Sequence, residues 1–467
     1  MPTTPDAYAV ILAAGRGTRM KSALAKVLHP LLGRPMVGHV VASARGAGLA
    51  PVLVVNHQEE AVRAAFAGTD TQFVRQLQTL GTGDAVASAL SVLPESGTVV
   101  VMAGDAPLIR CETISALLAA HGDAAVTVLT VVLADGAHYG RLERDGSGMP
   151  LRIVEASEAS AEQLELCEIN TGLYCFDIAW LRAVLPTLEP HAPKNEVYLT
   201  DTVERAAAEG RARVVTHDDP EEVAGINDRL ELALTRTVLQ ARIVEAHGRA
   251  GVDFLSPHSV LIDHSVTIAA DVSVGPGVVL QGSTCIAEGS TIGPYCHLVD
   301  AEIGPGVSVH SHSVIETAQV ESGASVGPYA RLRPQSRVCE GARVGNFVEM
   351  KKSTIGPGAK VNHLSYIGDA TVGAQANVGA GTITCNYDGF GKSPTTIDEG
   401  AFIGSNTALV APVTVGAGAI VGAGSVITKD VPAGAVSIAR GTQSNLEDAA
   451  DRFRARARSK AGDSDDG

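Results

Sequence analysis

The chain has 467 residues, of which 45% are hydrophobic and only 19% are charged, and this composition excludes disorder for most of its length. Because one hydrophobic core rarely organises so long a chain, we expect two domains. The formal net charge of −15 indicates a surface that repels phosphate groups, so we expect neither nucleic acid nor a membrane as a partner.

The cysteines and the N-terminus indicate the compartment. Seven cysteines without a CxxC pair argue against a disulfide framework and against a zinc ribbon, and they favour a reducing environment. The apolar run at residues 8–14 is too short to cross a bilayer and follows no basic region. We therefore predict a soluble, cytoplasmic protein.

The first part of the chain, residues 1–227, alternates short apolar runs with helical stretches. The runs at residues 9–14, 52–56, 99–103 and 126–133 predict strands. This order is typical of an α/β domain with a mostly parallel sheet covered by helices. Residues 228–250 predict a linker helix, because Leu230, Leu234, Val238 and Ile243 recur at helical spacing.

The third part, residues 251–467, has a six-residue period that neither a helix nor an alternating strand produces. The period predicts a parallel β-helix whose aliphatic residues point into a narrow prism. It also accounts for 50 glycines and only 4% aromatic residues. The repeated positions fall in three blocks: Ile262, Ile268, Val274, Leu280, Ile286, Ile292, Leu298; Val320, Val326, Leu332, Val338, Val344, Met350; and Ile397, Ile403, Leu409, Val415, Val421, Ile427.

Two segments of this third part depart from the period. The register is lost between Val378 and Ile397, where TCNYDGFGKSP is rich in turn formers, so we expect an outward loop there. From about Asn445 the chain alternates charge with alanine, which predicts a frayed helix followed by a flexible tail.

An acid-free window between Ala7 and Gln58 indicates an anion site, although the chain as a whole is acidic. The window contains Arg16, Arg19, Lys21, Lys26, Arg34 and Arg45. Within it, Gly15 and Gly17 of LAAGRGTRM directly follow the first strand, where a backbone without Cβ can approach a phosphate closely. The glycines alone suit an ordinary strand-to-helix turn equally well, but the basic window favours phosphate binding.

Two further segments belong to the same expected site. Asp105 in MAGDAP ends an apolar strand, where it suits either a Mg²⁺ ligand beside a triphosphate or a helix cap. QTLGTGDA supplies a glycine turn, Gly81 to Gly83, which suits either contact with a planar base or a helix entry.

A second basic segment runs from Ser322 to His363 within the predicted prism, and it suits either a second anion site or a solvated face. Its charged residues are Arg331, Arg333, Arg337, Arg343, Lys351, Lys352 and Lys360, against Glu340 and Glu349. His363 lies at its end, and a base with a pKa near neutrality is suited to removing a proton from an attacking amine.

The motifs together resemble a known family. LAAGRGTRM, AKVLHPLLGRPM, QTLGTGDA, AGDAP, YGR at 139–141, VEA at 154–156, EINTG at 168–172 and GIND at 225–228 are similar to those of sugar-1-phosphate nucleotidyltransferases. With the hexapeptide half, the chain to about residue 445 resembles the bacterial bifunctional N-acetylglucosamine-1-phosphate uridyltransferase and glucosamine-1-phosphate N-acetyltransferase family. The resemblance implies a Rossmann-like nucleotidyltransferase domain, a left-handed β-helix, a homotrimer, and a role in making UDP-N-acetylglucosamine for peptidoglycan and lipopolysaccharide.

For the first domain, the resemblance implies attack by the phosphate of N-acetylglucosamine 1-phosphate on the α-phosphorus of UTP, with release of pyrophosphate. It implies that Arg19 and Lys26 are catalytic and that Asp105 and Asn227 hold Mg²⁺. It also implies that Gln76, Gly81 and Thr82 contact the uracil edge together with backbone near Ala14, and that Gly140, Glu155 and Asn170 bind the N-acetyl sugar. The full set of implied nucleotide-binding and sugar-binding residues is Leu12, Ala13, Ala14, Gly15, Lys26, Gln76, Gly81, Thr82, Gly140, Glu155, Asn170 and Asn227. Two departures from the family, Asp84 where histidine is common and the EASEAS segment after Val154, are interpreted as peripheral.

For the prism, the resemblance implies acetyl transfer from acetyl-CoA to glucosamine 1-phosphate, with His363 as proton acceptor and with neither an acyl-enzyme nor a metal. Arg333, Lys351, Tyr366 and Asn377 would bind the sugar phosphate. The acetyl-CoA groove would be lined by Ala380, Asn386, Tyr387, Ser405, Ala423 and Arg440.

Two alternatives stay open. Hexapeptide prisms also occur in zinc-dependent γ-type carbonic anhydrases, and His297, His310 and His312 lie within this prism, where three histidines converging between subunits could hold a metal. Alternatively, the chain is a monofunctional nucleotidyltransferase whose prism serves regulation or oligomerisation.

Overall fold

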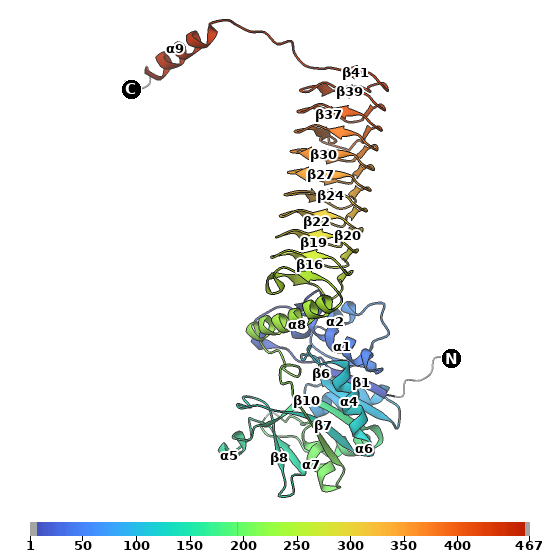
Figure 1. The fold of residues 1–467 in the computed structure, drawn as a ribbon. Coiled ribbons are helices and arrows are strands. Elements are labelled where there is room, and N and C mark those ends of the chain that lie inside the picture. The colour runs from blue at the N-terminus through green and yellow to red at the C-terminus, as the bar shows by residue number, and fades with distance from the viewer. Residues whose placement is uncertain (1–6, 194, 463–467) are drawn as a thin grey trace, which may run out of the picture. The chain divides into compact units, whose positions relative to one another are not determined.

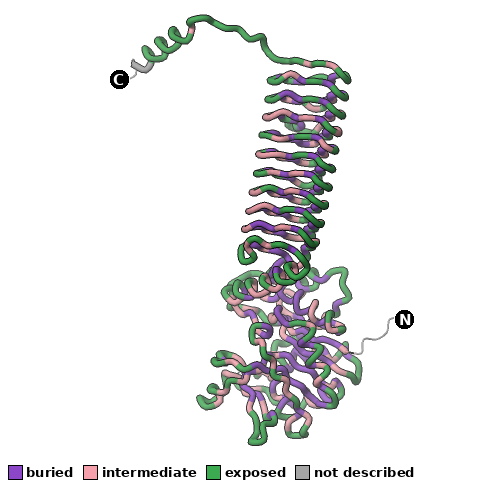
Figure 2. Tube along the Cα trace, viewed as in Figure 1, coloured by how far each residue is buried: buried purple, intermediate pink, exposed green. Residues whose placement is uncertain are grey.

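The computed structural model describes residues 7–193 and 195–462 and divides into two compact units. The first comprises Met1–Ala246 with Ile262–Ser265, and the second comprises His247–Leu261 with Val266–Gly467. Figure 1 colours the first unit blue to green and most of the second yellow to red. Figure 2 shows buried segments in both units, so each has its own core.

The first unit is built on a nine-stranded sheet with the order β11-β7-β10-β6-β1-β4-β5, to which β8 and β9 are attached beside β10. Strand β10 is antiparallel to both β6 and β7, whereas β1 runs parallel to β4 and β6. The bounds are β1 Ala7–Leu12, β4 Ala50–Val55, β5 Gln72–Arg75, β6 Thr98–Ala103, β7 Val126–Val132, β8 Arg141–Arg144, β9 Pro150–Val154, β10 Glu168–Asp177 and β11 Ala212–His217. A small hairpin joins β2 Pro30–Leu31 to β3 Arg34–Pro35.

Helices cover both faces of this sheet, which makes the unit a three-layer α/β structure. Successive residues of β1 enter different cores: Val10 packs with Val86 of α3 and Val203 of α7, whereas Ile11 packs with residues of α1 and α4. Because both faces are buried, the central strands are apolar along their whole length. The helices are α1 Met36–Gly46, α2 Glu59–Ala65, α3 Thr82–Ala89, α4 Cys111–His121, α5 Ala161–Leu164, α6 Ile178–Val184 and α7 Asp201–Ala208.

The four strands predicted from apolar runs correspond to β1, β4, β6 and β7. Strand β1 ends at Leu12, two residues earlier than predicted. The amide of Ala13 still donates to the carbonyl of Val54, and the chain then turns away. The residues after this point therefore form a loop at the carboxyl end of the sheet instead of extending the strand.

A helix, α8 Arg229–Arg249, occupies the segment predicted as the linker helix, but its buried face differs from the predicted one. Leu230 and Leu234 are exposed, whereas Leu232 and Val244 are buried. Leu232 packs against Met20 and the other residues of a small core cluster. Several spacings along this helix are compatible with a 3.6-residue turn, and this contact selects the face that is buried.

The second unit is a stack of short parallel strands in three sheets (Figure 1), as the six-residue period predicts. One sheet holds β12 Asp253–Phe254, β15 Ser273–Val274, β18 Thr291–Ile292, β21 Ser308–Val309, β24 Ser325–Val326, β27 Arg343–Asn346, β30 Lys360–His363, β33 Asn377–Val378, β36 Phe402–Ile403, β39 Ile420–Val421 and β41 Val436–Ser437. The second holds β13 Leu261–Ile262, β16 Val279–Gln281, β19 His297–Val299, β22 Val314–Glu316, β25 Arg331–Leu332, β28 Glu349–Lys351, β31 Tyr366–Gly368, β34 Ile383–Cys385, β37 Ala408–Val410 and β40 Val426–Ile427. The third holds β14 Thr267–Ile268, β17 Cys285–Ile286, β20 Glu302–Ile303, β23 Gln319–Val320, β26 Arg337–Val338, β29 Thr354–Ile355, β32 Ala370–Val372, β35 Thr395–Ile397 and β38 Val413–Val415.

Every aliphatic position of the three predicted blocks is buried. In the first sheet, for example, Val326 pairs in register with Val344, and Val344 pairs with Val361. The narrow interior is therefore a column of equivalent aliphatic side chains. Left-handed winding stays a prediction from the resemblance.

The predicted outward loop is confirmed, but it is shorter than the predicted interruption. Strand β34 continues the register with Thr384, which is buried in the position of an aliphatic residue. The chain leaves the stack only between this strand and β35, and Phe390 at the loop tip is 98% exposed. Because Thr384 occupies a core position that is elsewhere aliphatic, the six-residue period cannot be recognised there from the sequence.

The C-terminal segment forms the predicted helix, α9 Ala449–Gly462, whose residues from Asp451 to Lys460 are exposed. The end of the predicted tail lies outside the described residues. Across residues 7–193 and 195–462, no helix combines the length and the apolar composition needed to span a bilayer.

Candidate active sites

The first candidate site is a cavity of about 670 Å³ in the first unit, beyond the carboxyl ends of β1 and β6. Gly17 shapes its floor, because a Cβ at this position would lie 2.4 Å from Cβ of Lys26 and because its φ is +60°. The glycine therefore lets Lys26 approach the turn. Of the residues expected to bind nucleotide and sugar, the cavity is lined by Leu12, Ala13, Ala14, Gly15, Lys26, Gln76, Gly81, Thr82, Glu155 and Asn227, together with Arg19 and Asp105.

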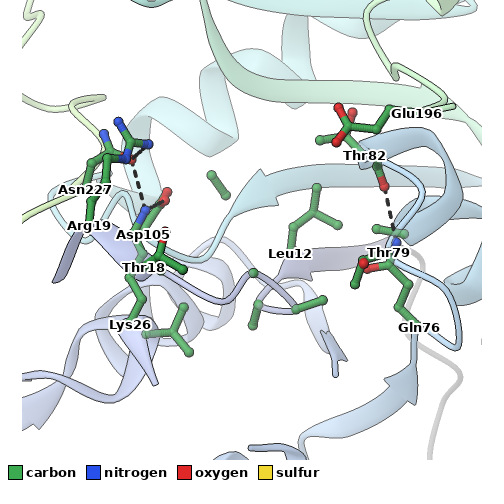
Figure 3. A pocket seen from close by; sticks show the side chains of 18 of the residues that line it. Leu12, Thr18, Arg19, Lys26, Gln76, Thr79, Thr82, Asp105, Glu196 and Asn227 are labelled. Carbon is green, nitrogen blue, oxygen red and sulfur yellow. Dashed lines mark hydrogen bonds and ion pairs between the residues drawn. The ribbon is translucent and has the colours of Figure 1, made fainter. Parts of the chain in front are cut away.

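One end of the cavity gathers the expected catalytic cations and metal ligands (Figure 3). Lys26 Nζ lies 2.5 Å from Asp105 Oδ2 and 3.1 Å from Asn227 Oδ1. A guanidinium nitrogen of Arg19 donates to the same oxygen of Asn227 at 2.8 Å. The sequence places these residues up to 208 positions apart. The fold brings them to one point where two positive charges can meet a phosphate.

The donor set at this end fits Mg²⁺. Asp105 Oδ2 and Asn227 Oδ1 both accept hydrogen bonds from one Lys26 ammonium group, so one cation can reach both oxygens. Mg²⁺ prefers oxygen ligands and commonly takes one or two from protein, with phosphate and water completing its shell.

The opposite end of the cavity carries the residues expected to contact the base, with Leu12 between the two ends (Figure 3). Gln76 is buried, and its amide nitrogen lies 2.7 Å from Asp84 Oδ2. Gly81 has a φ of +99°, and a Cβ there would lie 2.5 Å from the carbonyl oxygen of Val197. Asp84, which the sequence analysis interpreted as peripheral, therefore contacts a residue of the site.

A second cavity of about 210 Å³ shares Asp105, Glu155 and Asn227 with the first and adds Gly140 and Asn170. All the residues expected to bind nucleotide or sugar thus line one of two adjoining cavities. Asn170 precedes an irregularity in the pairing of β10 with β7, and its side chain bonds the hydroxyl of Tyr174 at 2.6 Å. Asn170 thus lines the smaller cavity from the last regular pair before this irregularity.

Glu155 connects the two cavities. Its carboxylate accepts a hydrogen bond of 3.0 Å from the hydroxyl of Thr200. Burial raises the pKa of Glu155 above its ordinary value, and the charges of Asp201 and Glu158 act in the same direction, against the Thr200 hydrogen bond. Such a half-desolvated carboxylate suits recognition of sugar hydroxyls, which donate hydrogen bonds to it.

Several cavity residues were not predicted from the sequence. His138 Nε2 lies 3.4 Å from Asn227 Nδ2, and the Tyr139 hydroxyl accepts from the amide of Gly225 at 3.3 Å. Glu196 and Tyr198 line the larger cavity from the segment before α7. Only Tyr139 falls in a quoted motif. No motif in the sequence marks the segment before α7 as part of the site. A backbone contact positions this segment: the carbonyl of Val197 accepts a hydrogen bond from the amide of Gly83 at 2.9 Å.

The second candidate site lies on the β-helix around His363, at the end of β30. Nδ1 of its ring lies 2.6 Å from Oδ1 of Asn346, the residue paired with it in β27. Because an amide oxygen only accepts hydrogen bonds, Nδ1 carries the hydrogen and Nε2 keeps its lone pair. The histidine is therefore held in the tautomer that can accept a proton. Asn346 was not predicted as part of the site.

Cationic side chains gather on the second sheet and on the outward loop: Lys351 ends β28, Arg333 follows β25, and Lys392 lies between β34 and β35. Arg333 pairs with Glu349 at 2.9 Å. The pKa of Lys351 is lowered, chiefly because Lys392 contacts it and adds a like charge, and secondarily because of Arg333. These three cationic side chains are therefore close enough for their charges to act on one another. The sequence does not indicate that Lys392 belongs to this site, because its segment, GFGKSP, is rich in turn formers and predicts only a loop.

Tyr366 and Asn377, the other expected sugar ligands, lie on strands next to these residues. Tyr366 begins β31 and pairs in register with Glu349 of β28. Asn377 begins β33, which pairs with β30. Asn377 thus belongs to the sheet of His363, and Tyr366 belongs to the sheet of Lys351.

Small residues continue the position of His363 along the stack. The carbonyl of His363 accepts from Gly381, that of Ala380 accepts from Asn406, and that of Ser405 accepts from Gly424. Positions 363, 380, 405 and 423 therefore recur in successive coils. The guanidinium of Arg440 donates to the carbonyl of Ala423 at 2.7 Å.

The outward loop begins beside the same stack. Asn386 donates to Asp369 Oδ2 at 2.6 Å, and the exposed Tyr387 donates its hydroxyl hydrogen to the carbonyl of Gly389 at 2.7 Å. Asp388 Oδ1 accepts from the amide of Phe390 at 2.8 Å and thereby fixes the turn. These hydrogen bonds hold the loop in one conformation, so it can border a binding site beside the stack.

The carbonic anhydrase alternative gains no support from the structure. His297 contacts Gln281 Oε1 at 2.9 Å, and His310 contacts Ser325 Oγ at 3.0 Å. The ring of His312 is stacked between Tyr295 and Tyr329, at centroid distances of 5.1 and 4.8 Å. Each of the three rings thus contacts a neighbour within its own chain.

The two units define a class of enzyme: a nucleotidyltransferase domain followed by a hexapeptide-repeat transferase domain. Residues 9–177 match the family model of the MobA-like NTP transferase domain, and residues 394–429 match that of the bacterial transferase hexapeptide, which consists of six repeats.

Relatives of similar length give the particular family. The chain is 46% identical to a protein of Alkalilimnicola ehrlichii over 94% of this chain and 95% of the relative. It is 45% identical to one of Brevibacillus brevis over 96% and 97%, and 47% identical to one of Anaeromyxobacter sp. over 86% and 84%. All three relatives are named Bifunctional protein GlmU. The chain belongs to the GlmU family, and this membership favours two activities over the monofunctional alternative.

Proposed function

We propose that the chain catalyses two successive steps in the synthesis of UDP-N-acetylglucosamine. In this proposal, residues 251–467 acetylate glucosamine 1-phosphate, residues 1–227 then transfer uridylyl from UTP to N-acetylglucosamine 1-phosphate, and residues 228–250 link the two domains. The observation that carries the proposal is the presence of two separate cation-lined sites, one in each unit, in a chain that belongs to the GlmU family.

In the acetyl transfer, the amine of glucosamine 1-phosphate attacks the thioester carbonyl of acetyl-CoA. Nε2 of His363 accepts the amine proton as the nitrogen–carbon bond forms, and the coenzyme A thiolate leaves and takes up a proton. Asn346 holds the ring in the required tautomer. Arg333, Lys351 and Lys392 supply the charge that binds the sugar phosphate. Ala380, Ser405 and Ala423, whose side chains are small, would line the acetyl-CoA groove.

In the uridylyl transfer, a phosphate oxygen of N-acetylglucosamine 1-phosphate attacks the α-phosphorus of UTP, and pyrophosphate leaves. Positioning and charge neutralisation provide most of the catalysis. Lys26 and Arg19 stabilise the negative charge that develops on the phosphates. Mg²⁺, which Asp105 and Asn227 would hold, neutralises phosphate charge when bound. Glu155, Asn170 and Gly140 orient the sugar in the smaller cavity.

The proposal extends to the assembly and the compartment. A column of stacked rings lies on the β-helix and consists of Tyr295, His312, Tyr329 and Phe347. The two tyrosines and the phenylalanine are exposed. An exposed aromatic column of this kind would be buried against further copies of the chain, and the resemblance to the family gives the number three. Light scattering after size-exclusion chromatography tests the proposed homotrimer. The seven unpaired cysteines support a cytoplasmic enzyme, which would supply precursors of peptidoglycan and lipopolysaccharide.

An omission experiment on the purified full chain tests the proposed function. With glucosamine 1-phosphate, acetyl-CoA, UTP and Mg²⁺ together, UDP-N-acetylglucosamine forms. Omitting acetyl-CoA stops its formation, whereas supplying N-acetylglucosamine 1-phosphate in place of the first two substrates restores it. A chain that uses UTP but releases no free coenzyme A thiol would instead be the monofunctional enzyme.

A further inference from the structure

The side-chain amide of Gln76 is held in one orientation by two acceptors. Gln76 follows β5 and is only 3% exposed. Its Nε2 donates to Asp84 Oδ2 at 2.7 Å and to the carbonyl oxygen of Gly81 at 3.2 Å. A carboxylate and a backbone carbonyl can only accept hydrogen bonds, so both require the NH₂ group to face them. The opposite orientation would place the amide oxygen of Gln76 against two other oxygens.

The consequence of this orientation is a hydrogen-bond acceptor at the wall of the cavity. Both hydrogens of the Gln76 amide are used within the protein, whereas its oxygen Oε1 has no partner among the described residues. Gln76 lines the cavity at the end opposite Lys26 (Figure 3). Next to it, the amides of Gly81 and Thr82 begin α3 and have no acceptor in the described part of the chain. This side of the cavity thus offers one hydrogen-bond acceptor, Oε1 of Gln76, beside two donors, the amides of Gly81 and Thr82.

We propose that Asp84 is a positioning residue that sets the base specificity of this cavity. It holds Gln76 so that Oε1 accepts a hydrogen bond from the N3–H of a uracil-type imide. This inference rests on the proposed function, in which UTP occupies the cavity, and it adds the reason why the base is uracil. Asp84 acts through Gln76 and does not itself contact the nucleotide.

The comparison of uracil with cytosine isolates this effect, because the two rings have the same size. Uracil presents a donor, N3–H, between two carbonyl acceptors. Cytosine presents a lone pair at N3, which would face the Gln76 oxygen and leave two buried acceptors unpaired. A site built to pair with one polar edge rejects a mismatched edge strongly, because the buried polar groups of the site lose their partners.

Without the Asp84 carboxylate, only the longer bond to Gly81 would resist rotation of the amide. A rotated Gln76 presents its NH₂ group to the cavity, and this group can donate to N3 of cytosine. Removing Asp84 is therefore expected to weaken the use of UTP and to improve the use of CTP. A residue that only supported the fold would lower both together.

The test measures kcat/KM for UTP and for CTP, with N-acetylglucosamine 1-phosphate as co-substrate. Asp84→Ala is expected to lower the UTP to CTP ratio by about tenfold or more. Asp84→Asn, whose amide oxygen can still accept from Gln76, is expected to keep the ratio within about threefold of the unaltered protein. Asp70→Ala removes an exposed carboxylate of the same unit and is the matched control, with an unchanged ratio.

A double-mutant cycle adds a second readout. In a Gln76→Ala background, Asp84→Ala is expected to leave the ratio unchanged, because the residue through which it acts is gone. Should Asp84→Ala fail to fold, Asp84→Ser, whose hydroxyl is too short to reach Nε2, is measured by the same criteria.

Three results would overturn the inference: an equal loss with UTP and CTP, an unchanged ratio in Asp84→Ala, or the same shift in the Gln76→Ala background. If the unaltered chain itself fails to use UTP, the proposed function is wrong as well. If the unaltered chain prefers UTP and Asp84→Ala does too, only the role of Asp84 is wrong.

Discussion

Lys26→Ala is the substitution that separates the chemistry of the first unit from its stability most clearly. Among the described residues, Lys26 is the side chain that hydrogen-bonds both Asp105 and Asn227, at 2.5 and 3.1 Å. In the proposed reaction, its ammonium group neutralises charge that develops on the phosphates. Its removal therefore takes a positive charge from the transition state and leaves the Asp105 carboxylate without its ion-pair partner.

The structure gives different magnitudes for the two effects. Removing one preorganised charge-stabilising group costs about 10²–10³-fold in kcat, or about 2.7–4 kcal/mol. For folding, the Lys26 and Asp105 side chains are 12% and 25% exposed, so water partly screens the pair. Loss of a hydrogen bond between charged groups in such a place costs about 1–2 kcal/mol, which lowers the melting temperature of the unit by only a few degrees.

The assay follows pyrophosphate release from UTP and thiol release from acetyl-CoA on the same preparation, with the melting temperature measured in parallel. Lys21→Ala, in the same basic window but exposed and outside the cavity lining, is the matched control. We expect Lys26→Ala to lose only pyrophosphate release. Near-normal pyrophosphate release, or an equal loss in the control, would refute the assigned role of Lys26.

Four further predictions address the remaining parts of both sites. His363→Ala is expected to lower acetyl transfer by about 10²–10⁴-fold and to leave uridylyl transfer intact, and joint loss would show that the sites are not independent. Asp105→Ala or an excess of chelator is expected to stop uridylyl transfer alone, so loss of acetyl transfer on chelation would contradict the metal assignment. Gly81→Ala is expected to destabilise the first unit by about 1–3 kcal/mol and to raise the KM for UTP, because its Cβ would lie 2.5 Å from the Val197 carbonyl oxygen. Glu155→Gln tests pH dependence by thermal melting. Burial raises the pKa of Glu155 above 4.5, so the folded state binds its proton more tightly than the unfolded chain does, and the native protein loses stability as pH rises from that value. The gain in melting temperature of Glu155→Gln is therefore expected to be larger at about pH 7 than at about pH 4, and an equal gain at both would contradict the burial argument.

The parts of the fold that depend on local pattern were predictable. The β-helix follows from the six-residue period because every coil uses the same few positions, and each predicted aliphatic residue is buried. The N-terminal strands follow from apolar runs because both faces of their sheet are covered. The antiparallel direction of β10 left no mark in the sequence, since a strand buried on both faces has the same composition in either direction.

The site was predictable where a motif marks a strand end, and it was not where a distant contact decides. Gly15 and Asp105 lie together because the carboxyl ends of β1 and β6 meet at one edge of the sheet. Asn227 lies before α8 instead, and the amide of its neighbour Ile226 donates to the carbonyl of Asp105 at 2.9 Å. Asn346 and Lys392, in contrast, acquire their roles only through contacts with His363 and Lys351. Asparagine and lysine are common on protein surfaces, so the sequence alone does not indicate that Asn346 positions a histidine or that Lys392 belongs to a cationic site.

The most direct test of two independent sites in one chain is complementation between two inactive variants. Lys26→Ala and His363→Ala are each supplied with glucosamine 1-phosphate, acetyl-CoA, UTP and Mg²⁺, first separately and then mixed. We expect neither variant alone to make UDP-N-acetylglucosamine at an appreciable rate, and we expect the mixture to make it, because N-acetylglucosamine 1-phosphate formed by the first diffuses to the second. A mixture as inactive as its components would contradict the account.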